Sequence, residues 1–167
     1  MFMVVASSAL LLTTGGTAAQ AAEQLVSRID SYCTLTVNYP HASTHFSGTI
    51  NVTAKTTCPI PMTSIYIDTE LKRTAPTAGS WWNGFGVTEY ASTWALDTQA
   101  TSCAAGPGTF RGWATTRIVV PPGYVLTGSP YDSKYGVAIA LACGVNKSLV
   151  AIPTDVAEVR IEFERVP

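Results

Sequence analysis

The chain has 167 residues, of which 47% are hydrophobic and 13% are charged, and its formal net charge is −1. This near-neutral balance does not favour nucleic acid as a partner, because nucleic-acid-binding domains usually present a basic face. The length suits a single domain with one hydrophobic core.

The N-terminal segment has the pattern of an export signal. Residues 2–12 are apolar, and Ala19-Gln20-Ala21 matches the small-x-small sequence that precedes a signal-peptidase site. The apolar run is shorter than the roughly 20 residues that span a bilayer. No Lys or Arg precedes it, although a basic start is usual, and a buried N-terminal helix is the alternative. We expect a signal peptide at residues 1–21 and one secreted domain at 22–167, without membrane association after cleavage.

The rest of the chain shows the two-residue alternation that is typical of strands. The alternation is clearest at 33–37, 48–58, 65–71, 137–143 and 158–164, and further strands are expected at 81–85, 89–96 and 109–120. Turn signals fall at Pro40, at Pro59 and Pro61, and at 75–79, 106–108 and 121–123. About seven short strands separated by such turns predict an all-β, immunoglobulin-like β-sandwich of antiparallel strands.

Four cysteines in an exported chain indicate two disulfides. Cys33 and Cys58 both lie on the apolar faces of their strands, and a hairpin through residues 39–47 would place them opposite each other. The sequence therefore predicts the pairs Cys33–Cys58 and Cys103–Cys143. Each pair closes a loop long enough to stabilise the fold by roughly 3–4 kcal/mol.

Several short motifs carry a resemblance. They are Pro40-His41 with GTINV at 48–52 before Cys58, GTFRGWA at 108–114, and PPGY at 121–124. The pattern resembles a group of small secreted actinobacterial proteins that have a signal peptide, two cysteine pairs and no assigned activity. The resemblance implies an exported bacterial protein, and it gives no catalytic residue.

No arrangement of polar residues specifies a reaction, and we expect no enzyme, no cofactor and no metal. His41 and His45 lack a third ligand at a suitable spacing, and we assign them to a structural loop. No G-x-S-x-G motif is present. Asp68 and Glu70 fall on one strand face about 7 Å apart, as glycoside hydrolysis would need, but a solvated strand face is the simpler interpretation.

The aromatic residues are the most suggestive feature. Trp81 and Trp82 are adjacent, so one of them should point outward from a strand, and Phe85 and Tyr90 follow. Exposed rings beside polar groups could bind sugars or a protein, whereas a Trp buried against a disulfide is the structural alternative. We name Trp81, Trp82, Phe85 and Tyr90 as possible ligand contacts.

These observations favour a secreted, non-enzymatic β-sandwich that binds an extracellular protein or a cell-wall polysaccharide. Two other classes stay open. One is a protease inhibitor that presents the stiff segment at residues 58–62, and the other is a hydrolase with an unrecognised site.

Overall fold

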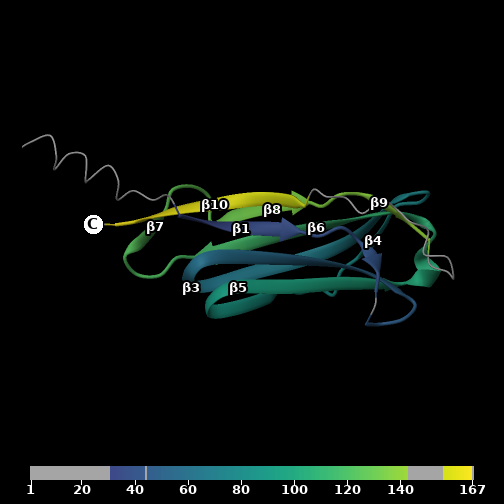
Figure 1. Cartoon of the computed structure of the whole chain (residues 1–167), viewed down its shortest axis with the longest axis horizontal. Coiled ribbons are helices and arrows are strands. Elements are labelled where there is room, and N and C mark those ends of the chain that lie inside the picture. The colour runs from purple at the N-terminus through teal and green to yellow at the C-terminus, as the bar shows by residue number, and fades with distance from the viewer. Residues whose placement is uncertain (1–30, 44, 143–155, 167) are drawn as a thin grey trace, which may run out of the picture.

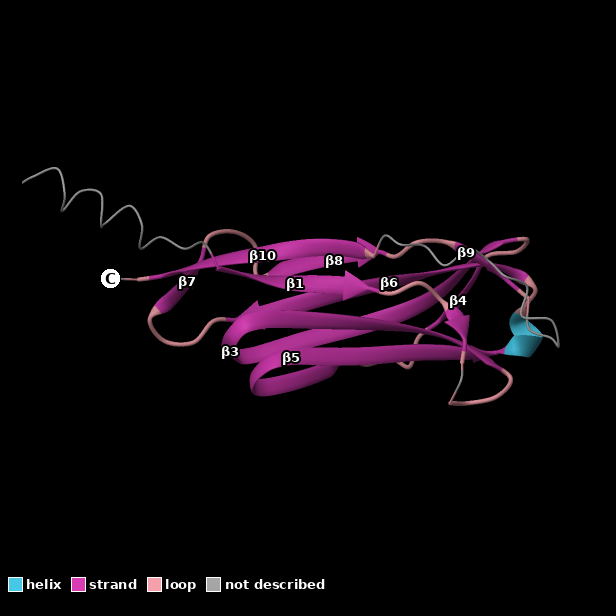
Figure 2. Cartoon of the chain, viewed as in Figure 1, coloured by secondary structure: helices cyan, strands magenta, loops and turns pink. Residues whose placement is uncertain are grey.

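The structure is a computed structural model that describes residues 31–43, 45–142 and 156–166. The predicted signal peptide lies outside this part of the chain. Strands make up most of the described residues, which also include a single turn of 3-10 helix, η1, at Cys103–Ala105 (Figure 2). The strands are β1 Ser31–Val37, β2 His41–Ala42, β3 Thr49–Ala75, β4 Gly79–Trp81, β5 Val87–Ser102, β6 Gly108–Val119, β7 Tyr124–Leu126, β8 Tyr131–Tyr135, β9 Ile139–Leu141 and β10 Ala157–Arg165.

All of these strands pair antiparallel in one curled sheet, whose main path has the order β7-β10-β1-β3-β6-β8. Off this path, β2, β4 and β5 pair with β3, and β9 pairs with β6. Strand β3 has 27 residues and carries the curl (Figure 1). Its first half pairs with β1, its second half pairs with β6, and β5 runs beside both halves. The all-β, antiparallel fold is confirmed. The assignment to an immunoglobulin-like sandwich of about seven strands stays a prediction.

The two halves of the curled sheet enclose one core, which is built from the apolar positions of the alternating strands. Leu35, Val52, Ile67 and Phe110 are among its fully buried side chains. The halves pack tightly at Gly112 of β6, where an added Cβ would lie 2.7 Å from the Val52 side chain. A larger residue at that position would therefore force the two halves apart.

The prediction of a chain break at Pro59 and Pro61 is wrong, because β3 continues through both residues. The pairing of β3 with β5 shifts register between Thr57 and Met62, so the prolines occupy an irregular stretch without ladder partners on β5. Proline has no N–H to donate, and it is tolerated at such bulges. The bulge lies between the two halves of β3, and strands bend at such irregularities.

Two further strand predictions need correction. The strand expected at 81–85 is β4, which ends at Trp81, and residues 82–86 form a loop with Gly84 at a φ of 90°. The strand expected at 89–96 is the longer β5. Of the strand expected at 137–143, the described part is β9.

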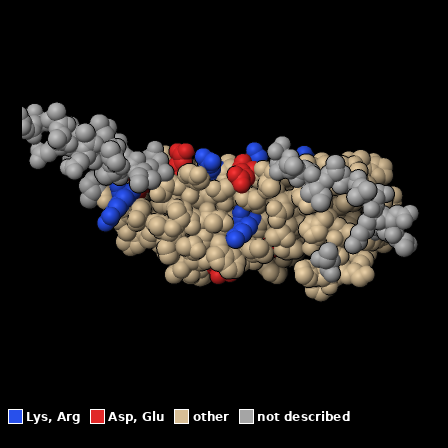
Figure 3. Space-filling model, viewed as in Figure 1, with Lys and Arg blue, Asp and Glu red and all other residues tan. Residues whose placement is uncertain are grey.

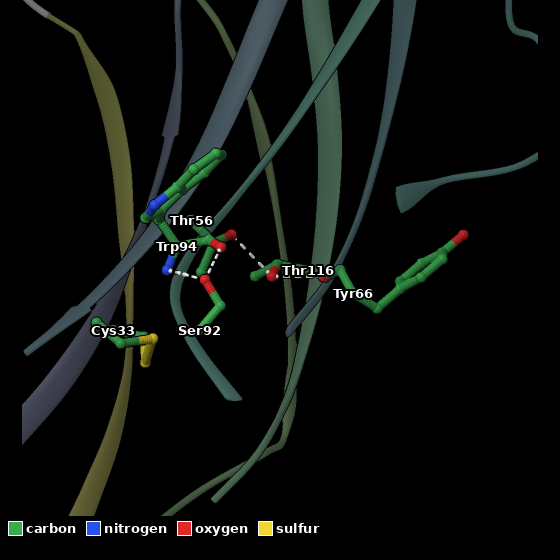
Figure 4. The surroundings of a disulfide bond; sticks show 7 residues. Cys33, Thr56, Tyr66, Ser92, Trp94 and Thr116 are labelled. Atoms are coloured by element: carbon green, nitrogen blue, oxygen red, sulfur yellow. Dashed lines mark hydrogen bonds between the residues drawn. A yellow bond between two sulfur atoms is a disulfide. The ribbon is translucent and has the colours of Figure 1, made fainter. Parts of the chain in front are cut away.

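The disulfide Cys33–Cys58 is confirmed. The pairing of β1 with β3 places Thr34 opposite Thr57, so the same register brings Cys33 opposite Cys58. Close to it, the Thr56 hydroxyl donates to the Thr116 hydroxyl at 2.8 Å, which joins the two halves of the sheet (Figure 4). The second predicted pair stays a prediction, because Cys143 lies outside the described residues.

Candidate functional site

One outer face of the curled sheet gathers aromatic side chains from four strands and a loop. The face is formed by the outward positions of the second half of β3, the first half of β5, and strands β6 and β8. We call it the aromatic face and define it by its six rings, which are Tyr66, Trp82, Tyr90, Trp113, Tyr131 and Tyr135.

Cross-strand pairing arranges these residues in rows. Tyr66 on β3 lies between Thr88 of β5 and Arg117 of β6, and Arg117 is paired in turn with Tyr131 of β8. Two residues along, the same register pairs Asp68 with Thr115 and Thr115 with Ser133. Residues directly opposite each other on one sheet face have their Cβ atoms about 5 Å apart, so the rows form a continuous surface.

An open groove of about 540 Å³ lies on this face. Tyr90 and Tyr131 border it and are 74% and 52% exposed, respectively. In Figure 4 the ring of Tyr66 points away from Thr116 and from the disulfide, toward the outer side of β3. The groove is lined by Ser64, Tyr66, Thr88, Tyr90, Arg117, Val119 and Tyr131.

Asp68 lies two residues after Tyr66 on β3, and its predicted place on a solvated strand face is wrong. The side chain is buried, with 8% exposure, because the loop at 82–86 folds over it. The Trp82 indole donates a hydrogen bond from Nε1 to Asp68 Oδ1 at 2.8 Å. An added Cβ on Gly86 would lie 2.2 Å from the Ile67 carbonyl, so only glycine allows the loop to lie this close to β3.

The electrostatics at Tyr66 follow from this arrangement. Burial raises the pKa of the Tyr66 phenol above its ordinary value, and the negative charge of Asp68 raises it further, while a hydrogen bond with the Gly86 backbone lowers it. Tyr66 is therefore a neutral phenol at physiological pH, able to donate or accept a hydrogen bond.

The two carboxylates that could have served glycoside hydrolysis are both engaged. Asp68 accepts from Trp82, and Glu70 Oε2 lies 2.6 Å from Lys72 Nζ. A general acid and a nucleophile both need carboxyl oxygens that can reach the substrate.

The four predicted contact residues have different surroundings. Tyr90 borders the groove, and Trp82 covers Asp68 with 56% of its surface exposed. Phe85 is exposed on the 82–86 loop. Trp81 packs against the core, where its ring centroid lies 5.9 Å from that of Phe110.

Comparisons return no matching protein family, curated protein or solved structure. The site must therefore be interpreted from its own geometry. Among the described residues, no helix is long and apolar enough to cross a bilayer, and no three His, Cys, Asp or Glu side chains cluster as metal ligands would. His41 contacts the Tyr39 carbonyl through Nδ1 at 3.3 Å, and His45 is exposed.

The segment considered for protease inhibition lies within β3 itself. Pro59 and Pro61 are exposed, but Cys58 and Met62 on either side are buried. The outer acidic positions of β10 are solvated as expected, with Glu158 and Glu162 exposed.

Sequence analysis missed most of the aromatic face. Tyr66, Trp113, Tyr131 and Tyr135 lie on three strands that are distant along the chain. The alternation within each strand could have shown that its rings share one side. The register that brings the strands together was not available from the sequence.

Proposed function

We propose that this protein is an exported, non-enzymatic binding module that holds a carbohydrate ligand on its aromatic face. The observation that carries the proposal is the open groove bordered by Tyr66, Tyr90 and Tyr131 on a regular sheet surface. The Cys33–Cys58 disulfide supports export, since disulfides persist mainly in oxidising compartments. The shared core between the two halves of the sheet supports the predicted sandwich architecture.

The chemistry of the groove favours sugars. Phenol rings provide flat apolar surfaces on which the apolar sides of sugar rings can stack, and Tyr hydroxyls add polar contacts. Ser64, Thr88 and Arg117 stand beside these rings and supply hydrogen-bonding groups for sugar hydroxyls. A ligand site commonly combines a mostly apolar surface with a few polar groups that set orientation.

The face of the molecule seen in Figure 3 offers little for a strongly charged partner. Charged side chains are scattered singly over an otherwise uncharged surface in the view of Figure 3. Trp94 and Tyr32 are exposed on the opposite outer face, where Lys55 and Arg160 lie over their rings just as Arg117 and Arg111 lie over Tyr131 and Tyr135. They serve as controls that show whether an exposed ring outside the groove also affects binding.

The experiment is a pull-down of the purified protein on insoluble cellulose, chitin and peptidoglycan. We expect the wild type to be retained on at least one matrix, and Tyr131→Ala and Tyr90→Ala to be released into the supernatant. Both side chains are at least half exposed, so their removal should leave the fold intact, which circular dichroism checks.

Trp94→Ala is the matched control, because it removes a ring of similar exposure from the opposite face. Its retention should equal that of the wild type. If no matrix retains the wild type, or if Trp94→Ala alone abolishes retention, the proposal fails. A protein partner or an inhibitory role would then be the next hypothesis to test.

A further inference from the structure

The cationic side chains of the aromatic face lie over its aromatic rings. Arg111 and Arg117 lie six residues apart on β6, which corresponds to about 20 Å along the strand. The Arg117 guanidinium lies 5.4 Å from the centroid of Tyr131, and that of Arg111 lies 4.0 Å from the centroid of Tyr135. Each guanidinium is thus held in place by an aromatic ring.

Neither guanidinium has a polar partner within the described part of the chain. The ion pair found there is Lys72–Glu70, and no carboxylate lies within 4.0 Å of Arg111 or Arg117. No hydrogen bond joins either side chain to another described residue, and Nε of Arg111 is buried without a partner. By contrast, Arg73 donates to the carbonyls of Thr77 and Ala105.

The end of the face near Arg111 has a further excess of positive charge. Lys72 lies directly opposite Arg111 across the β3–β6 ladder. Like charges opposite each other repel, and Glu70 balances just one of them. An anionic group between Lys72 and Arg111 would remove this repulsion and would accept charge-assisted hydrogen bonds from the guanidinium.

We propose that the ligand of the aromatic face is an acidic polysaccharide, whose carboxylates bind Arg111 and Arg117 while its sugar rings lie along the aromatic face. This inference rests on the proposed function and names its ligand class. Hydroxyls at Thr115 and Ser133 lie in the row between the two arginines, where sugar hydroxyls would pass.

The experiment compares two polymers that differ only in charge, polygalacturonate and its methyl ester, by affinity electrophoresis of the full protein. We expect polygalacturonate to bind more tightly, with an affinity that falls as salt is raised. Arg111→Gln and Arg117→Gln should each weaken binding about tenfold, as the loss of one charge-assisted contact predicts.

Arg160→Gln is the matched control. Arg160 also covers a tyrosine ring, at 4.2 Å from the centroid of Tyr32, but on the opposite face of the sheet. Its affinity for polygalacturonate should equal that of the wild type.

The outcomes separate the two proposals. If the methyl ester binds as tightly as polygalacturonate and the Arg111 and Arg117 variants bind normally, the inference is overturned and the proposed function stands. If neither polygalacturonate nor alginate binds, the inference is overturned as well, and the pull-down on cellulose, chitin and peptidoglycan decides the proposed function separately. Tighter binding of polyglutamate or oligothymidylate than of either polysaccharide would also overturn it.

Discussion

Asp97 joins the two halves of the curled sheet through a buried carboxylate. It lies on the part of β5 that pairs with the first half of β3, opposite Ala54. Its Oδ2 accepts a hydrogen bond from the backbone N–H of Thr69, in the second half of β3, at 2.8 Å. Thr69 falls between the segments of β3 that pair with β5 and β4, so no strand accepts this N–H.

The substitution Asp97→Ala would leave that donor without an acceptor. Thr69 is fully buried and Asp97 is 5% exposed, so water cannot replace the lost bond without entering the core. An unsatisfied buried donor costs about 1–3 kcal/mol, and more where the lost partner was charged. We therefore expect a loss of about 2–4 kcal/mol in the free energy of unfolding.

Urea denaturation followed by Trp fluorescence measures this loss as a shift in midpoint at constant slope. The control is Asp132→Ala. Asp132 accepts from the N–H of the next residue, Ser133, just as Asp97 accepts from Thr98, but its bond is exposed. It should change stability by no more than about 0.5 kcal/mol. Equal effects of the two substitutions would refute the role assigned to Asp97.

Three other predictions concern the fold and the groove. Replacing Cys33 and Cys58 by Ala should cost about 3.5 kcal/mol, since the bridge spans 25 residues, and a loss below about 1 kcal/mol on urea denaturation would contradict this. Gly112→Ala should lower the melting temperature by overpacking, with a cost of about 1–3 kcal/mol, whereas Gly128→Ala, which has open space around it, should not. The raised pKa of Tyr66 contributes stability below the ordinary tyrosine pKa of about 10. That contribution is lost as the pH rises further, because the unfolded chain ionises first. Phenolate absorbance should show a late-titrating group that Tyr66→Phe removes, and an identical titration of the two proteins would contradict the assignment.

The features predicted correctly from the sequence are those that depend on alternation within a strand. The Cys33–Cys58 pair follows because each residue falls at an inward-facing position of its alternating strand. An antiparallel hairpin can align only positions that face the same side. The solvated positions of β10 follow in the same way. In each case a local pattern sets the outcome.

The features that sequence analysis missed depend on contacts between distant segments. The alternation of β3 places Asp68 on the outward-facing side, but the residue is buried because the 82–86 loop covers it. Trp81 and Trp82 are adjacent, so the alternation of side chains along a strand cannot by itself show which of them packs on the core. The prolines at 59 and 61 signal a turn locally, but the pairing on either side keeps β3 continuous.

The central claim is that an acidic carbohydrate binds to the aromatic face, and the four indole N–H signals of the protein test it most directly. Trp82 and Trp113 lie on this face, Trp94 lies on the opposite face, and Trp81 packs on the core. In an NMR titration with soluble oligogalacturonate, we expect the Trp82 and Trp113 signals to move and the Trp94 signal to stay in place. Movement of Trp94 alone, or of no indole signal at saturating ligand, would contradict the claim.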